Sequence, residues 1–153
     1  MPNVAVTRAE PIDAGPVGEV FDLYRQFYGA DPDVDASIHF IAERLRAKDA
    51  AIFVARIEGT PSSRADGFMQ LFPKLSTARM RRDWILNDLY VRDDVRRKGV
   101  AKALMREAVA WAKRTGAGRL SLKTQVHNAS ARKLYERLGW RLEEEFVTYL
   151  RDV

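Results

Sequence analysis

The spacing of hydrophobic positions changes along the chain and divides its first part into extended and helical segments. Weak alternation over residues 4–8 predicts a first strand. Apolar residues then recur at helical spacing over residues 16–28 and again over residues 34–47, which predicts two consecutive helices. A continuous apolar run over residues 50–57 predicts a strand that is buried on both faces.

Two further strands are predicted over residues 67–72 and 83–91, with a turn over residues 73–79 between them. A polar, basic loop follows, and after it an amphipathic helix that ends at Gly116. The apolar stripe of this helix consists of Val100, Leu104, Ala108 and Trp111.

The C-terminal part is predicted to hold a strand over residues 119–126, a short helix over 128–138 and a strand-like segment over 140–150. The order is therefore strand, helix, helix, three strands, helix, strand, helix and strand. Helices alternate with strands only in the second half, which indicates a mixed α/β (α+β) sheet rather than a doubly wound one. No internal repeat or linker interrupts residues 1–153, so we expect a single domain.

Composition excludes several classes of function. Hydrophobic residues make up 46% and charged residues 31% of the chain, which is an ordinary globular balance. There are no cysteines, which excludes disulfides, thiolate metal sites and cysteine nucleophiles, and we expect no metal site. Residues 1–10 lack the apolar core of a signal peptide, and no apolar run approaches the roughly 20 residues that span a bilayer. We therefore expect a cytoplasmic protein without a membrane partner.

Positive charge is concentrated in one stretch of the chain. Between Arg79 and Arg114, eleven Lys or Arg residues face five Asp or Glu, a surplus of six beside a net charge of +5 for the whole chain. Such a patch suits a nucleic acid, a membrane surface or a phosphorylated cofactor. Charge alone does not choose among these, and a solvated helix face is the structural alternative.

The most informative part of this stretch is Arg-Arg-Lys-Gly-Val-Ala at residues 96–101, where a strand gives way to a helix. The first turn of a helix leaves N–H groups without internal partners and carries the positive end of the helix dipole. A pyrophosphate placed there can accept several of those N–H groups. Gly99 and Ala101 keep the turn free of bulk, and the three basic residues add mobile charge. A basic helix start with an incidental glycine is the alternative.

A second informative segment covers residues 128–140. Asn128 stands where a helix N-cap is expected, and Tyr135 follows two helical turns later, so the two side chains project from the same face. A tyrosine hydroxyl, with a pKa near ~10, can give a proton to a developing thiolate. A plain cap and a core aromatic with a solvated hydroxyl are the structural alternatives.

Together the two segments resemble the GNAT superfamily of N-acetyltransferases. In that family the acetyl-CoA-binding element is Gln/Arg-x-x-Gly-x-Gly/Ala, and a later motif is Asn-x-x-Ala-x-x-x-Tyr followed by glycine and an aromatic residue. The matching positions are Arg96, Gly99, Ala101, Asn128, Ala131, Tyr135, Gly139 and Trp140. The resemblance covers residues 83–150 and extends to the N-terminal half only in the order of elements.

The resemblance implies the GNAT fold, a central, twisted, mostly antiparallel mixed sheet with about four helices. It also implies an enzyme that moves an acetyl group from acetyl-CoA to a primary amine by direct attack on the thioester. The cofactor-binding residues it implies are Leu89, Tyr90, Val91, Arg96, Arg97, Lys98, Gly99, Val100, Ala101, Lys102, Asn128, Ala131 and Tyr135. A backbone N–H of Leu89 or Tyr90 would stabilise the oxyanion, and Tyr135 would protonate the departing sulfur.

The general base is less well defined by the resemblance. Family members often carry a carboxylate on the strand over residues 84–91, but Ile85 and Asn87 stand at the positions to compare. Asp88 is the carboxylate nearby, and regular alternation would put it on the opposite face unless the strand is bulged. Direct loss of the proton to bulk water is the alternative.

The acceptor is expected beside the first two helices, where Tyr24, Phe27 and Tyr28 supply aromatic rings suited to a cation, with Asn87 nearby on a strand. Core packing is the alternative for these rings. The stretch over 84–91 resembles the branch that acetylates histone lysines and polyamines, so we expect a small amine or a lysine-bearing peptide as substrate. A sensor that binds CoA without turnover is the alternative.

The basic patch coincides with the cofactor loop, so no nucleic-acid partner is expected. The C-terminal strand-like segment, rich in Phe146, Val147, Tyr149 and Leu150, has an edge that could pair with a second subunit, and we expect a homodimer.

Overall fold

The computed structural model describes all 153 residues. The strands are β1 (Val4–Arg8), β2 (Ala51–Ile57), β3 (Gly67–Ser76), β4 (Arg81–Val91) and β5 (Leu120–Ser121). The helices are α1 (Ala14–Phe27), α2 (Val34–Ala47), α3 (Val100–Arg114) and α4 (Ala129–Arg137), with short 3-10 turns at Pro11–Asp13 and Asp93–Val95. None of the helices combines the length and apolar character that crossing a bilayer requires.

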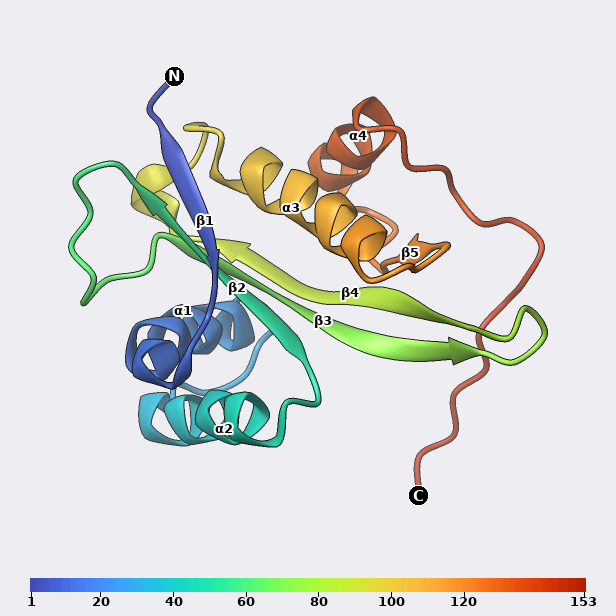
Figure 1. The fold of residues 1–153 in the computed structure, drawn as a ribbon, viewed down its shortest axis with the longest axis horizontal. Coiled ribbons are helices and arrows are strands. Elements are labelled where there is room, and N and C mark those ends of the chain that lie inside the picture. The colour runs from blue at the N-terminus through green and yellow to red at the C-terminus, as the bar shows by residue number, and fades with distance from the viewer. The chain divides into compact units, whose positions relative to one another are not determined.

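The chain forms two compact units, residues 1–122 and residues 123–153. The first unit holds a five-stranded sheet in the order β1-β2-β3-β4-β5 (Figure 1). The pairs from β1 to β4 are antiparallel, and β5 lies parallel to β4. This arrangement confirms the predicted mixed, mostly antiparallel sheet, and the order of elements is as predicted as far as α4.

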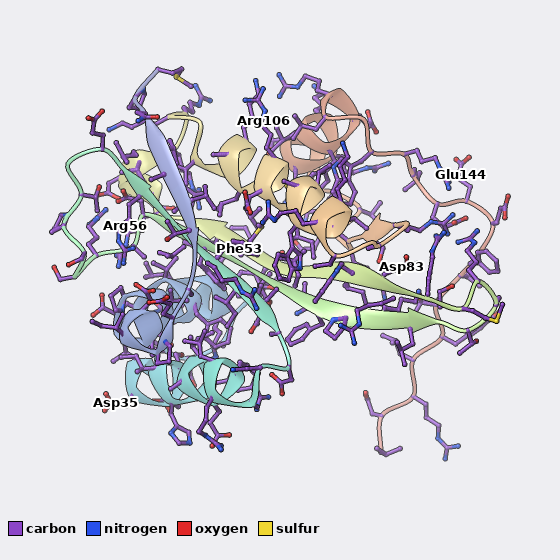
Figure 2. All side chains as sticks on the ribbon, viewed as in Figure 1. Asp35, Phe53, Arg56, Asp83, Arg106 and Glu144 are labelled. Atoms are coloured by element: carbon purple, nitrogen blue, oxygen red, sulfur yellow. The ribbon has the colours of Figure 1, made fainter.

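Helices cover both faces of this sheet, with α1 and α2 on one side and α3 on the other (Figure 1). Under α1 and α2 lies a core that includes Val17, Val20, Ile41, Ile52, Val54 and Phe68. On the α3 side, Leu104, Met105 and Ala108 are buried. Phe53 of β2 is labelled there in Figure 2, and its ring centroid lies 5.6 Å from that of Trp111. Val100, Leu104 and Ala108 of the predicted stripe are buried, whereas Trp111 is only partly buried.

Three strand predictions differ from the structure. The predicted turn over residues 73–79 is wrong, because β3 continues through Pro73, which lies opposite Trp84, and the chain turns only after Ser76. The strand predicted over 119–126 is limited to Leu120–Ser121, and residues 140–150 form no strand. Local alternation can favour an extended chain, but a strand also needs a neighbour that accepts its backbone hydrogen bonds.

A β-bulge interrupts β4 at Asn87. The register runs from Gln70 opposite Asp88 to Leu71 opposite Leu86, so Asn87 has no partner on β3. Side chains alternate between faces along a regular strand, and an extra residue therefore reverses the alternation on one side of it. This bulge meets the condition under which Asp88 turns to the other face of the sheet.

Candidate active site

The loop over residues 96–101 opens α3, with Gly99 as the N-cap. Gly99 has a φ of 84°, and Arg97 is also left-handed with a φ of 61°, which is uncommon for a residue with a side chain. The first intrahelical bond runs from the Ala103 N–H to the Gly99 carbonyl at 3.0 Å, so the N–H groups of residues 100–102 lie before it. Because the Val100 side chain is only 1% exposed, this residue can offer a ligand its backbone alone.

Ion pairs hold the segment over residues 93–96, which leads into this loop. Two bonds, 2.9 and 2.8 Å long, join the Arg64 guanidinium to the Asp94 carboxylate. Arg96 pairs with Asp93 at 2.8 Å, and its guanidinium lies 5.5 Å from the centre of the Tyr90 ring. The exposed basic side chains around the helix start are Arg96, Arg97, Lys98 and Lys102. Exposed positive charge therefore surrounds the backbone N–H groups at the start of α3.

The backbone of β4 is open along half of its outer edge. β5 pairs with β4 only at Trp84 and Ile85, so no strand covers that edge over residues 86–91. Leu89, Tyr90 and Val91 lie on this stretch, directly before the loop. An extended ligand can add itself to such an edge like a further strand.

The aromatic candidates from α1 gather against β3 and β4. The ring of Tyr24 packs edge-on against Phe68 at 6.1 Å, and the ring of Phe27 lies 6.2 Å from that of Tyr90. Tyr28 contacts both Tyr24, at 5.0 Å, and Phe27, at 5.2 Å. Phe27 and Tyr28 are 55% and 49% exposed, so these two rings are open to a ligand rather than packed in the core.

Asp88 faces the same side of the sheet as these rings. Phe68 packs with α1 and α2, and Gln70 shares its face because it lies two residues further along β3. Asp88 lies opposite Gln70 and is buried. The Gln70 Nε2 donates to Asp88 Oδ2 at 2.7 Å, and the Asn87 Nδ2 donates to Asp88 Oδ1 at 3.1 Å. Both carboxylate oxygens are thus held by amides.

The bulge also connects β4 to α1, since the Tyr24 hydroxyl donates to the Asn87 carbonyl oxygen at 3.5 Å. The structure therefore brings the predicted acceptor residues together with the predicted base on one side of the sheet. No sequence pattern singled out Gln70 as a residue of the site. Its signal was a polar residue inside the otherwise apolar run over residues 67–72.

Three further buried carboxylates, Asp22, Asp66 and Asp83, hold the framework together. Burial raises the pKa of Asp22, but hydrogen bonds from Ser37, the Asp33 N–H, Gln26 and Arg25 outweigh it and lower the pKa overall. The pKa values of Asp66 and Asp83 are lowered by the same balance of burial and hydrogen bonds. These groups stay ionised at neutral pH, with their oxygens occupied by hydrogen bonds within the framework.

The second unit carries the other sequence motif. The Asn128 side chain caps α4, because its Oδ1 accepts the Ala131 N–H at 3.3 Å. Tyr135 lies two turns further along α4, and its ring centroid is 6.3 Å from that of Trp140. The predicted N-cap is confirmed, and the role of Tyr135 as an acid stays a prediction.

The model of the acetyltransferase (GNAT) family matches residues 17–140, and the chain belongs to this family. An uncharacterized N-acetyltransferase of Bacillus subtilis, YhfO, is 35% identical over 148 residues, which cover 97% of each chain. A probable acetyltransferase of Haemophilus influenzae is 31% identical over 66% of this chain and 67% of its own. The crystal structure of a probable acetyltransferase, 35% identical, superposes with a TM-score of 0.90 over 97% of each chain.

The protein is therefore an acyltransferase, and its cofactor is acetyl-CoA, the acetyl donor of GNAT enzymes. The residues at the start of α3 fit a pyrophosphate. A Cβ added at Gly99 would contact only the end of the exposed Met1 side chain, whose Cε would lie at 3.6 Å, so no backbone fills the space beside the helix start. The predictions of family, fold class, enzyme class and cofactor are confirmed.

Proposed function

We propose that this enzyme acetylates a primary amine on a small cationic molecule, with polyamines as the first candidates. The observation that supports this acceptor is the pair of exposed rings, Phe27 and Tyr28, on the sheet face that also holds the buried carboxylate of Asp88. Aromatic faces attract an ammonium, and a carboxylate can remove its proton. A histone-type lysine is the larger acceptor that the same chemistry would serve.

The proposed cofactor site is the loop over residues 96–101 together with the open edge of β4. The N–H groups at the start of α3 would bind the pyrophosphate, and Arg97, Lys98 and Lys102 would balance its charge. The backbone of residues 89–91 would pair with the pantetheine arm. Asn128 and Ala131 would support the site from α4.

In the proposed reaction, Asp88 accepts a proton from the ammonium, because the nitrogen has no lone pair before that. The amine then attacks the thioester carbonyl, and the backbone N–H of Leu89 or Tyr90 stabilises the oxyanion. The carbon–sulfur bond breaks, and Tyr135 donates a proton to the sulfur. The nitrogen loses its second proton to solvent, and the Tyr135 phenolate regains a proton from solvent. The products are the acetylated amine and free CoA.

One relative supports a small cationic acceptor. The aminoglycoside N(6')-acetyltransferase of Salmonella typhimurium is 26% identical over 137 residues, 83% of this chain. Its acceptor, an aminoglycoside, is a small amine and not a protein. A single catalytic domain, a homodimer and a cytoplasmic location remain predictions of the same proposal.

The test is the release of CoA thiol from acetyl-CoA with a panel of polyamines, aminoglycosides and lysine peptides. We expect kcat/KM for a polyamine to exceed that for any lysine peptide by about tenfold, equivalent to ~1.4 kcal/mol. A preference for lysine peptides would assign a protein acceptor instead. Micromolar binding of acetyl-CoA with no turnover of any amine would identify a sensor.

A further inference from the structure

A pair of polar side chains lies inside the sheet layer that faces α1 and α2. Gln70 is 1% exposed and Asp88 is 5% exposed, and they stand opposite each other on β3 and β4. On β3 the neighbours on the same face are Phe68 and Phe72, and both pack in the apolar cluster with the two helices. At this depth a residue pair is ordinarily apolar.

The orientation of the Gln70 amide is fixed by its partner. Its Nε2 donates to Asp88 Oδ2 at 2.7 Å, and exchanging the amide nitrogen and oxygen would set two acceptors against each other. In this orientation the Gln70 Oε1 is buried and has no hydrogen-bond partner. Unsatisfied buried polar atoms are rare in native proteins and call for an explanation.

The pair therefore carries two costs, a buried carboxylate and a buried acceptor without a donor. Replacing both members of a buried polar pair by apolar groups is often neutral or stabilising. Polar groups kept in spite of such costs are concentrated at functional sites. This pair stands next to the bulge at Asn87, on the face where Tyr24 reaches β4.

We propose that Gln70 is a positioning residue for the acetyl transfer and acts through Asp88. The Gln70 Nε2 donates to Oδ2 of Asp88, and this bond fixes the rotation of the Asp88 carboxylate. The lone pairs of the carboxylate that Gln70 does not occupy then keep one direction, toward the acceptor amine. The Asp88 Oδ1 accepts a hydrogen bond from the Asn87 side chain and has a further lone pair that can take the proton of the amine. This inference rests on the proposed function, because it requires that Asp88 is the base.

The test is a double-mutant cycle with Gln70→Met and Asp88→Asn, assayed with the best amine of the panel. We expect Asp88→Asn to lower kcat by about 100-fold, as for loss of a general base. Gln70→Met should lower kcat about tenfold without changing the KM for acetyl-CoA. In the Asp88→Asn background, Gln70→Met should have no further effect, because the group it positions is gone.

Gln26→Met is the matched control, because Gln26 also donates to a buried carboxylate, Asp22 Oδ2, at 2.9 Å. It should lower the melting temperature and leave kcat within about twofold of the wild type. The melting temperature of the double variant Gln70→Met/Asp88→Leu separates a catalytic role from a structural one. If the polar pair serves catalysis and not stability, this variant should melt at or above the wild-type temperature.

Additive losses of kcat in the cycle, or a lower melting temperature of the apolar pair, would overturn the role of Gln70. Wild-type kcat in Gln70→Met or in Asp88→Asn would do the same. Failure of the proposed function looks different, since it shows in the wild-type enzyme alone, which would then turn over no amine of the panel or would prefer lysine peptides.

Discussion

The cofactor loop and the acceptor face lie in the same unit but are built in different ways. The loop is one contiguous segment, residues 96–101, and in the proposed site it acts chiefly through backbone N–H groups at the start of α3. The proposed acceptor face takes Tyr24 and Tyr28 from the C-terminal end of α1 and the residue after it, Gln70 from β3 and Asp88 from β4. The difference suggests that cofactor binding is set by a short motif, whereas acceptor choice depends on how three elements meet.

The largest effect is expected at the loop, from Gly99→Glu. A side chain at a φ of 84° is strained, and a carboxylate there would repel the pyrophosphate. We expect affinity for CoA to fall at least about 100-fold, equivalent to ~2.7 kcal/mol. Titration calorimetry with CoA measures this loss directly.

Gly59→Glu is the control for this variant. Gly59 has a φ of 93° with open space around it, so the same substitution adds the same charge and a similar backbone strain away from the loop. Its affinity for CoA should stay at the wild-type value. Equal losses in both variants would show that strain, and not the loop, controls binding.

A smaller effect is expected for Tyr135→Phe, which tests whether α4 contributes chemistry as well as a fold motif. If the hydroxyl protonates the departing sulfur, kcat should fall about tenfold to 100-fold while the Kd for CoA stays unchanged. Tyr149→Phe serves as the control, because that residue is 91% exposed in the same unit. Unchanged kcat in Tyr135→Phe would remove Tyr135 as the acid.

The smallest effect is expected at the acceptor face, from Tyr28→Leu. Loss of an exposed aromatic contact with a cation is worth about 0.5–1 kcal/mol, so the KM for the amine should rise about twofold to fivefold. The KM for acetyl-CoA should not change. Phe40→Leu on α2 removes an aromatic ring of similar exposure, 42%, and should leave both values unchanged. A rise in the KM for acetyl-CoA would place Tyr28 at the cofactor instead.

The helices were the part of the fold that the sequence predicted best. The second helix occupies Val34–Ala47 as expected, and α1 differs from its prediction by only two residues at the start and one at the end. Helical periodicity depends on residues three and four apart, so a short segment contains it. The shortened β5 and the missing last strand show the opposite case, because pairing depends on residues distant in sequence.

By itself the sequence indicated the family and the cofactor, because two short segments, residues 96–101 and 128–140, carry their motifs locally. The phosphate-binding role of residues 96–101 is a prediction of the same local kind. The tertiary structure decided which way Asp88 faces. One extra residue in β4, Asn87, moves the carboxylate to the side covered by α1, because side chains alternate with a period of two. The tertiary structure also places Gln70 of β3 against the Asp88 carboxylate of β4. Two residues 18 positions apart in sequence form this contact, so no local sequence pattern predicts it.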